Sequence, residues 1–298
     1  MHGTGEQVEV SGPIIDKLSM VLDCEDSECQ GHADYIDTLI DEYDWLQRLP
    51  TNYRGMRYRY NWSVLLNENT GARCLLQAAP YKGQFRIEFN PVKSGSSGLA
   101  ALRRRLEVLL MDYAALLFAE GRVTRIDIAV DVRPVCLNYL KLYPLGLSLS
   151  SCNYGAGGTA VESVYMGSAR SKLQFTIYDK YRESARSAYS DTVRFEAKIR
   201  RPMLLCDINL IANPYEKLLV SDFFDTSSVR QPPHRYLHFF DSVRQRGLHP
   251  ALALILDSRT RKKYRDLFGD VYDCEWWNPQ EIWSGFACEV DHLQRHLL

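Results

Sequence analysis

Three short segments of the chain combine acidic, basic and phenolic side chains with the alternating pattern of a β-strand. In each segment apolar residues fill every second position, so the polar residues share the opposite face. The segments are residues 124–132, 173–180 and 194–200. If the three strands lie in one sheet, their polar face carries two aspartates, a glutamate, a tyrosine and several cations. These residue types suit chemistry on a phosphate group.

The acidic residues of these segments are candidate ligands for a divalent cation. Asp127, Asp131 and Glu196 offer the hard oxygen atoms that Mg²⁺ or Mn²⁺ prefers. Two residues four positions apart on a strand lie about 13 Å from each other, so both aspartates reach one ion only if the strand bends. We therefore expect Asp127 and Glu196 to be the main ligands and Asp131 to be a weaker one.

Two groups of basic residues are candidates for contacts with nucleic acid. Beside the polar strands they are Arg170, Lys172 and Lys198, and between residues 53 and 66 they are Arg54, Arg57 and Arg59. The second group alternates with tyrosine and tryptophan, and aromatic rings can stack on unpaired bases while arginines bind phosphates. The alternative interpretation is a solvated surface for the first group and cross-strand aromatic pairs at a sheet edge for the second.

Composition indicates a globular protein. The chain has 298 residues, of which 46% are hydrophobic and 24% are charged. No apolar run approaches the roughly 18–20 residues of a membrane span, and the N-terminus lacks the features of a signal peptide. The cysteines are scattered without a metal-binding motif, which predicts reduced thiols and a cytoplasmic location.

The net charge of −1 conceals an asymmetry along the chain. The first 50 residues contain twelve Asp and Glu against Lys17 and Arg48, a balance of −10, so the remaining residues carry +9. A basic body is compatible with nucleic-acid binding, but solvated charge without a partner explains it as well.

The order of the expected elements predicts an α+β fold with a mostly antiparallel sheet, flanking helices and a helical C-terminal region. Strands are expected at 10–22, 73–79 and 84–89 besides the three polar segments, and helices at 34–49, 99–120, 202–219, 236–245 and 279–298. We divide the chain into an acidic segment with the first strand (1–50), a core (51–225) and a helical region (226–298). The basic run at 259–265 is either a solvated helix face or a contact to a DNA backbone.

The polar segments TRIDIAVDV, YMGSARSKLQFTIYDKYRE and VRFEAKIR, in this order, resemble the replication initiation factor family. This family comprises the Rep-trans initiators of rolling-circle plasmids and some filamentous phages. The resemblance covers about residues 10–215, and the early IDKLSMVLD agrees with it.

The resemblance implies a DNA nickase that starts rolling-circle replication by tyrosine transesterification. The family's nucleophile corresponds to Tyr178, with Lys180 beside it and Tyr181 and Tyr165 as alternates. The enzyme would keep a 5′-phosphotyrosine and release a 3′-hydroxyl primer, with Mg²⁺ or Mn²⁺ as cofactor. Its implied partners are single-stranded or extruded origin DNA, a host helicase and a second copy of the chain, without a membrane. The alternatives are a DNA-binding protein without catalysis and a metal-dependent nuclease that uses water.

Overall fold

The structure is a computed structural model that describes residues 7–51, 58–137, 140–147, 149–154, 161–222, 238–239, 241–242, 248–269 and 276–298. The chain forms two compact units that interleave along the sequence. Unit 1 consists of Met1–Pro13, Ala129–Lys198 and Ala212–Gly285, and unit 2 consists of Ile14–Ile128, Ile199–Ile211 and Phe286–Leu298. Our division at residues 50 and 225 follows the sequence and stays a prediction.

Unit 2 is built on a sheet with the strand order β3-β4-β5-β6-β2-β7. The strands are β2 (Ile14–Asp23), β3 (Leu46–Arg48), β4 (Tyr60–Asn67), β5 (Ala72–Ala79), β6 (Gln84–Phe89) and the first part of β7 (Arg122–Arg133). The pairs β3–β4, β4–β5, β5–β6 and β6–β2 are antiparallel. The expected hairpin of β5 and β6 is confirmed, with Gly83 at φ +54° in its turn.

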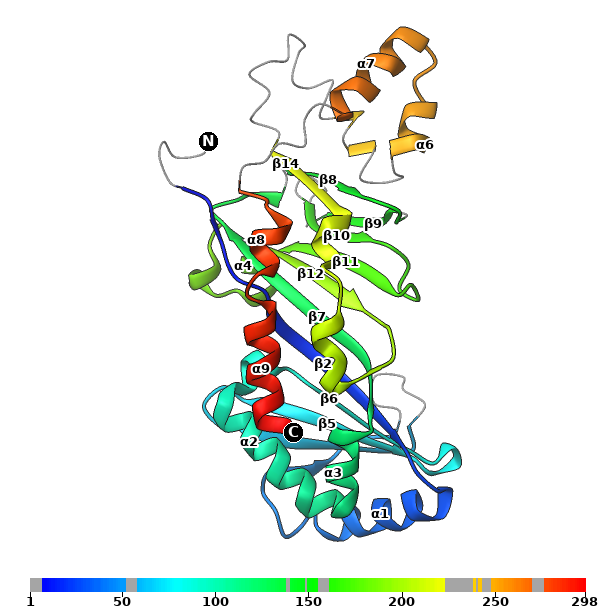
Figure 1. Ribbon diagram of the computed structural model, residues 1–298, viewed down its shortest axis with the longest axis vertical. Helices are drawn as coiled ribbons and strands as arrows, with labels where there is room; N and C mark the ends of the chain where they lie inside the picture. Colours follow the sequence, from blue (N-terminus) through cyan, green and yellow to red (C-terminus); the bar gives the residue numbers. More distant parts are fainter. Residues whose placement is uncertain are drawn as a thin grey trace. The chain divides into compact units, whose positions relative to one another are not determined.

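Helices cover one face of this sheet (Figure 1). They are α1 (Asp26–Thr38), α2 (Pro91–Leu110), α3 (Asp112–Ala119) and α9 (Phe286–Leu297). α2 packs on β2, β4 and β5, while α9 packs on α2 and β2. The buried leucines of α2 lie at helical spacing, and the alternate residues of β2 and β6 are buried apolar side chains. The opposite face of the sheet therefore carries the polar residues.

Two helix predictions in unit 2 need correction. The helix expected at 34–49 lies earlier, because Leu46 pairs with Val64 as part of β3 and the chain turns after Thr38. The helix expected at 99–120 is two helices that meet at Met111, whose backbone has φ +51°. α2 also starts at Pro91, before the expected helix start at residue 99, and the Asn90 side chain caps it by accepting a hydrogen bond from the backbone N–H of Lys93.

Unit 1 contains the second part of β7 and the strand order β7-β12-β11-β10-β9. The bounds are β9 (Leu149–Tyr154), β10 (Val161–Met166), β11 (Leu173–Asp179) and β12 (Val193–Ile199, which ends at the unit boundary), and the short α4 (Lys180–Ser184) follows β11. β1 (Glu9–Val10) pairs with the end of β7, while β8 (Leu140–Pro144) and β14 (Leu218–Asp222) form a separate pair. The three polar segments thus form strands, as the sequence predicted.

Aromatic side chains fill the core of unit 1 behind the polar strands. Phe195 lies 4.6 Å from Trp277 between ring centroids, and Phe175 lies 6.2 Å from Tyr215. The hydroxyl of Tyr215 donates a hydrogen bond to the carbonyl oxygen of Phe195, and burial raises the pKa of this phenol well above its usual value. The apolar side of β11 and β12 therefore faces a core, which leaves their polar side for a site.

The C-terminal third is partly helical. It contains α6 (Leu248–Ala253), α7 (Ser258–Gly269), α8 (Pro279–Trp283) and α9. The helix expected at 202–219 is instead a series of short 3₁₀ turns with β13 (Met203–Leu204) and the start of β14. Most of the helix expected at 236–245 lies outside the described residues.

The predicted fold class is confirmed: a large, mostly antiparallel sheet with flanking helices and a helical C-terminal end. In the part of the chain that the structure describes, no helix has both the length and the apolar character needed to cross a membrane.

Candidate active site

A pocket of about 370 Å³ opens on the polar side of the unit 1 sheet. Tyr178 on β11 pairs with Ser163 on β10, and Thr176 pairs with Tyr165, so these side chains share one face. The adjacent β12 adds Glu196 and Lys198 to the same pocket, whose rim includes Glu162, Asp179, Arg182 and Glu183. Strand alternation thus brings predicted residues from two separate segments into one cavity.

Glu196 and Lys198 form an ion pair inside this pocket. They lie two positions apart on β12, and the Lys198 Nζ atom is 3.4 Å from Oε1 of Glu196. Both side chains are largely shielded from solvent, with 10% of Glu196 and 17% of Lys198 exposed. A partly buried cation with one anionic partner at its side can still approach a phosphate oxygen from the pocket.

Tyr178 lies at the end of β11, where the chain turns into α4. The Asp179 side chain caps α4 by accepting a hydrogen bond from the backbone N–H of Arg182. The first residue of α4 is Lys180, whose Nζ atom lies 5.5 Å from the centroid of the Tyr178 ring and 2.7 Å from Glu183 Oε2. The helix cap therefore holds a cation close to the phenol ring.

The rim of the pocket is rich in carboxylates. Arg182 lies 2.8 Å from Glu162 and 3.5 Å from Asp179, while Glu183 is bound by Lys180. With Glu196, four carboxylates line the pocket against the cations Arg182 and Lys198. Of these four carboxylates, only Glu196 had been proposed from the sequence, so the surroundings of Tyr178 are more negative than we expected.

The other two predicted metal ligands are engaged by arginines. Arg194 on β12 donates hydrogen bonds to both carboxylate oxygens of Asp131, at 2.6 and 2.7 Å. Asp127 belongs to unit 2, where it is fully buried and accepts two hydrogen bonds from the Arg125 guanidinium. Asp131 and Glu196 thus lie in unit 1, and each of the three predicted ligands has a cationic partner.

These donors do not fit a bound metal ion. Among the residues that the structure describes, no three His, Cys, Asp or Glu side chains come together in a group that could hold one. The carboxylates of the pocket are distributed over separate ion pairs instead. We therefore derive no chemical step through a metal, and the predicted Mg²⁺ or Mn²⁺ stays an expectation of the resemblance.

Comparisons with known proteins give a match among the solved structures alone. No protein-family model and no curated protein matches the chain. The chain is similar in structure to a solved rolling-circle replication initiator. That protein is from Geobacillus stearothermophilus, and the match has a TM-score of 0.41 and 15% identity over 79% of this chain and 97% of the other. At this level of similarity the match assigns no role to any residue.

The remaining predicted residues lie outside the pocket. Tyr181 is on α4 with 47% of its surface exposed, and Arg170 and Lys172 are exposed in the turn between β10 and β11. Arg59 lies in unit 2 with its guanidinium 5.5 Å from the Tyr60 ring. Arg54 and Arg57 lie outside the described residues.

Sequence reasoning missed the contribution of β10 and of the rim. Glu162, Ser163 and Thr176 line the pocket but were not proposed as site residues. The alternation of Ser163 and Tyr165 with buried Val164 was a usable signal, because it marks a strand with one polar face. Glu162 could not be found this way, because its position depends on the β10–β11 pairing.

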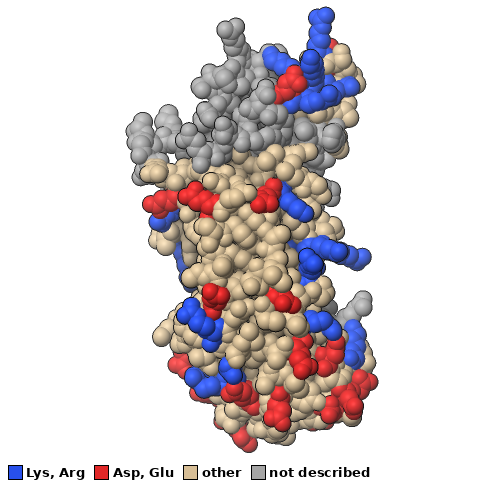
Figure 2. Space-filling view, viewed as in Figure 1, with Lys and Arg blue, Asp and Glu red and all other residues tan. Residues whose placement is uncertain are grey.

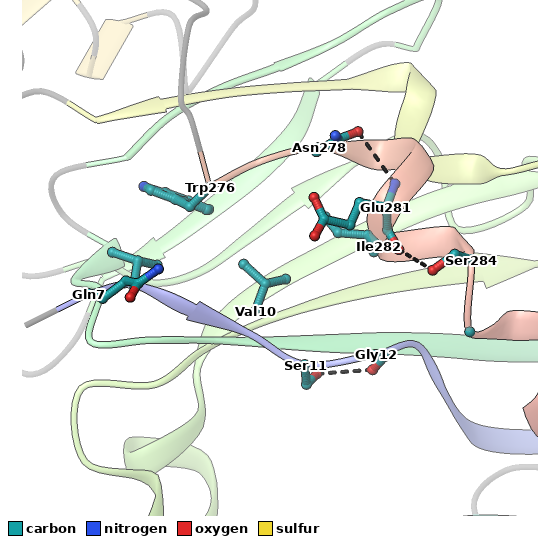
Figure 3. A pocket seen from close by; sticks show the side chains of 11 residues that line it. Gln7, Val10, Ser11, Gly12, Trp276, Asn278, Glu281, Ile282 and Ser284 are labelled. Atoms are coloured by element: carbon teal, nitrogen blue, oxygen red, sulfur yellow. Dashed lines mark hydrogen bonds between the residues drawn. The ribbon is translucent and has the colours of Figure 1, made fainter.

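A second and larger pocket in unit 1 lacks the groups that bind phosphate. It has a volume of about 600 Å³ and lies between the segment around β1 and the segment of α8. Figure 3 shows Gln7, Val10 and Trp276 around it, with the Glu281 side chain extending from α8. Its described lining contains no lysine or arginine, so the smaller pocket with Tyr178 is the better candidate for phosphate chemistry.

Basic side chains also gather on α7. Figure 2 shows Lys and Arg over this helix, which contains the basic run at 259–265. Arg259, Lys262, Lys263 and Arg265 are exposed. This arrangement suits the predicted contact to a DNA backbone, which stays a prediction.

Proposed function

We propose that this protein is a DNA-nicking enzyme that initiates rolling-circle replication, with Tyr178 as its nucleophile. The observation that carries the proposal is the pocket in which Tyr178, Glu196 and Lys198 meet. These residues come from two of the three segments on which the family resemblance rests. The same pocket offers a phenol, a carboxylate and a cation, which are the groups that a transesterification requires.

The proposed reaction exchanges one phosphate ester for another. The Tyr178 Oη atom attacks the phosphorus and loses its proton as the new P–O bond forms. The bond from phosphorus to the 3′ oxygen breaks, and that oxygen takes up a proton to become the 3′-hydroxyl primer. The products are a 5′-phosphotyrosine and a free 3′ end, so rejoining needs no additional energy source. The DNA must be unpaired to enter the pocket.

The neighbouring side chains have separate parts in this reaction. Glu196 accepts the proton of the attacking phenol, while Lys198 offsets the charge that builds up on the phosphate oxygens. Lys180 places positive charge beside the Tyr178 ring, where it favours the phenolate. Tyr215 has no such part, because its hydroxyl is buried in the core.

A covalent-complex assay tests the proposal. The substrate is a pool of single-stranded oligonucleotides of random sequence, labelled at the 3′ end and incubated with protein in MnCl₂ and, separately, in EDTA. The 5′-phosphotyrosine keeps the 3′-labelled fragment on the protein, so the labelled protein migrates more slowly in a denaturing gel. Carboxylates outnumber cations in the lining of the pocket. The two buffers therefore show whether nicking depends on added Mn²⁺.

Two variants identify the nucleophile. Tyr178→Phe removes the attacking oxygen and is expected to abolish the labelled band. Tyr181→Phe is the matched control, because Tyr181 is exposed three residues away, and it should keep the band. Cleavage without a band would support the nuclease that uses water, and binding without cleavage would support a protein that only binds DNA. A band of equal strength in Tyr178→Phe would refute the assignment.

A further inference from the structure

The side-chain hydroxyl of Thr176 is buried and has no hydrogen-bond partner among the residues that the structure describes. Only 4% of the residue is exposed. Thr192, another buried threonine of unit 1, differs in this respect, because its hydroxyl donates a hydrogen bond to the Ser190 carbonyl oxygen at 3.2 Å. A hydroxyl that is taken out of water without a partner destabilises the folded protein. Thr176 therefore carries a polar group that the free protein leaves unsatisfied.

Thr176 stands on the side of the sheet that faces the candidate active site. It lies on β11 two residues before Tyr178, so the two side chains point to the same face, roughly 7 Å apart along the strand. Its cross-strand partner on β10 is Tyr165. Its chain neighbours Phe175 and Ile177 are fully buried on the opposite face. Thr176 thus lines the pocket of about 370 Å³ that contains Tyr178, which we call the Tyr178 pocket.

We propose that the Thr176 hydroxyl donates a hydrogen bond to a phosphate oxygen of the DNA strand that enters the Tyr178 pocket. This inference rests on the proposed function and adds a substrate-binding residue to it. The non-bridging oxygens of a phosphodiester share a negative charge, so a hydroxyl binds them more strongly than a neutral acceptor. The Thr176 oxygen is shielded from solvent in the free protein, and rotation about the Cα–Cβ bond between the χ1 rotamers common in strands would turn it toward the pocket.

The charges around the pocket explain why a neutral donor is useful there. Both cations of the described lining are already held by carboxylates: Lys198 lies 3.4 Å from Glu196, and Arg182 lies 2.8 Å from Glu162. A phosphate that approaches either cation competes with a carboxylate for it. The Thr176 hydroxyl has no such competitor, so it can bind a phosphate oxygen without breaking an ion pair.

The binding test makes the same substitution at two buried threonines. Thr176→Val keeps the shape of the side chain and removes the hydroxyl, and Thr192→Val is the matched control outside the pocket. The probe is a fluorescein-labelled oligothymidylate, whose Kd is measured by anisotropy. We expect Thr176→Val to weaken binding about tenfold, as for the loss of one hydrogen bond to a charged group, and Thr192→Val to leave the Kd unchanged. Equal Kd values for Thr176→Val and the wild type would overturn the proposal.

Thermal stability should change in opposite directions at the two sites. Thr176→Val removes an unsatisfied polar group from the interior, so its Tm should rise by about 2–4 °C. Thr192→Val leaves the Ser190 carbonyl oxygen without its donor, so its Tm should fall. A variant that is more stable and binds more weakly has not lost binding through damage to the fold. If Thr176→Val is destabilised as much as Thr192→Val, the hydroxyl already has a partner in the free protein and the proposal is wrong.

A second pair of variants isolates the hydroxyl itself. Thr176→Ser keeps the hydroxyl and Thr176→Ala removes it, so the two proteins differ at one oxygen atom. We expect Thr176→Ser to bind the oligothymidylate with nearly the affinity of the wild type, and Thr176→Ala to bind it about tenfold more weakly. This comparison also decides the question if Thr176→Val does not fold. Equal affinities of the two variants contradict the proposed contact.

The covalent-complex assay separates this inference from the proposed function. If the wild type binds the oligothymidylate through Thr176 but forms no covalent band, nicking fails and the phosphate contact stands. If the wild type and Thr176→Val form the band at equal rates and bind equally, nicking stands and the contact is refuted. If inorganic phosphate raises the Tm of the wild type but not of Thr176→Val, while both bind the oligothymidylate equally, the hydroxyl binds free phosphate and the contact to DNA is refuted.

Discussion

Tyr178 and Tyr215 show how the position of a side chain decides what a phenol can do. Tyr215 is fully buried, and its pKa is raised by burial and then by the charge of Glu196, so its proton is held more tightly. Tyr178 is half-buried and lines a pocket with Glu196 and Lys198. A nucleophile must both reach its substrate and give up a proton. Of these two phenols, only Tyr178 lines a pocket that a substrate can enter, and it is therefore the one that we propose as the nucleophile.

The ion pair between Asp131 and Arg194 supports a prediction about stability. Its carboxylate holds Arg194, whose side chain is only 6% exposed. Asp131→Asn would leave a buried guanidinium without its anion, so we expect a loss of about 3 kcal/mol in the free energy of unfolding. Glu162→Gln is the control, because its exposed pair with Arg182 should be worth less than about 1 kcal/mol. Urea denaturation measures both, and equal losses would show that the Asp131 pair is not structural.

The candidate site is positioned by the pairing of its strands and by the point at which β11 ends. β10, β11 and β12 present one polar face because each strand alternates, and the pocket forms where β11 ends at the cap of α4. The presence of a strand and the alternation of its side chains can be predicted from the sequence, because both depend on residues that are close along the chain. The helices at 34–49 and 202–219 were wrong for the opposite reason: in both regions long-range strand pairs override the local apolar spacing.

The break between α2 and α3 supports a prediction at the scale of elements. Met111 is exposed and has φ +51° and ψ −127°, a conformation that glycine adopts far more easily than methionine. Met111→Gly should therefore raise the free energy of unfolding by about 1 kcal/mol. Leu116→Gly, in the interior of α3, should lower it by about 1 kcal/mol. Thermal and urea unfolding test both, and a destabilised Met111→Gly would show that the bend carries no strain.

The distribution of charge is a property of the whole molecule. The net charge is only −1, yet the first 50 residues carry −10 and the rest carries +9. Interactions between exposed charges fall off over about 10 Å at ordinary salt concentrations. A polyanion close to the basic part therefore responds to local charge more than to net charge.

This asymmetry predicts the salt dependence of DNA binding. Despite its net negative charge, the protein should bind single-stranded DNA more weakly as NaCl increases, with a log–log slope of about −0.7 for each phosphate contacted. Lys262→Gln with Lys263→Gln on α7 should reduce the magnitude of the slope if this helix contacts the backbone. A binding constant that does not change with salt would contradict the proposed phosphate contacts.

The sequence by itself determined the three polar strands, the β5–β6 hairpin, the fold class and the face to which Tyr178, Glu196 and Lys198 belong. These features depend on alternation, which is local and survives any arrangement of the strands. The tertiary structure alone decided that Asp131 and Asp127 are bound by arginines, that Glu162 reaches the pocket, and that Lys17 and Arg86 both contact Glu88. Each of these depends on which strands become neighbours, and strand neighbours are chosen by packing over the whole chain.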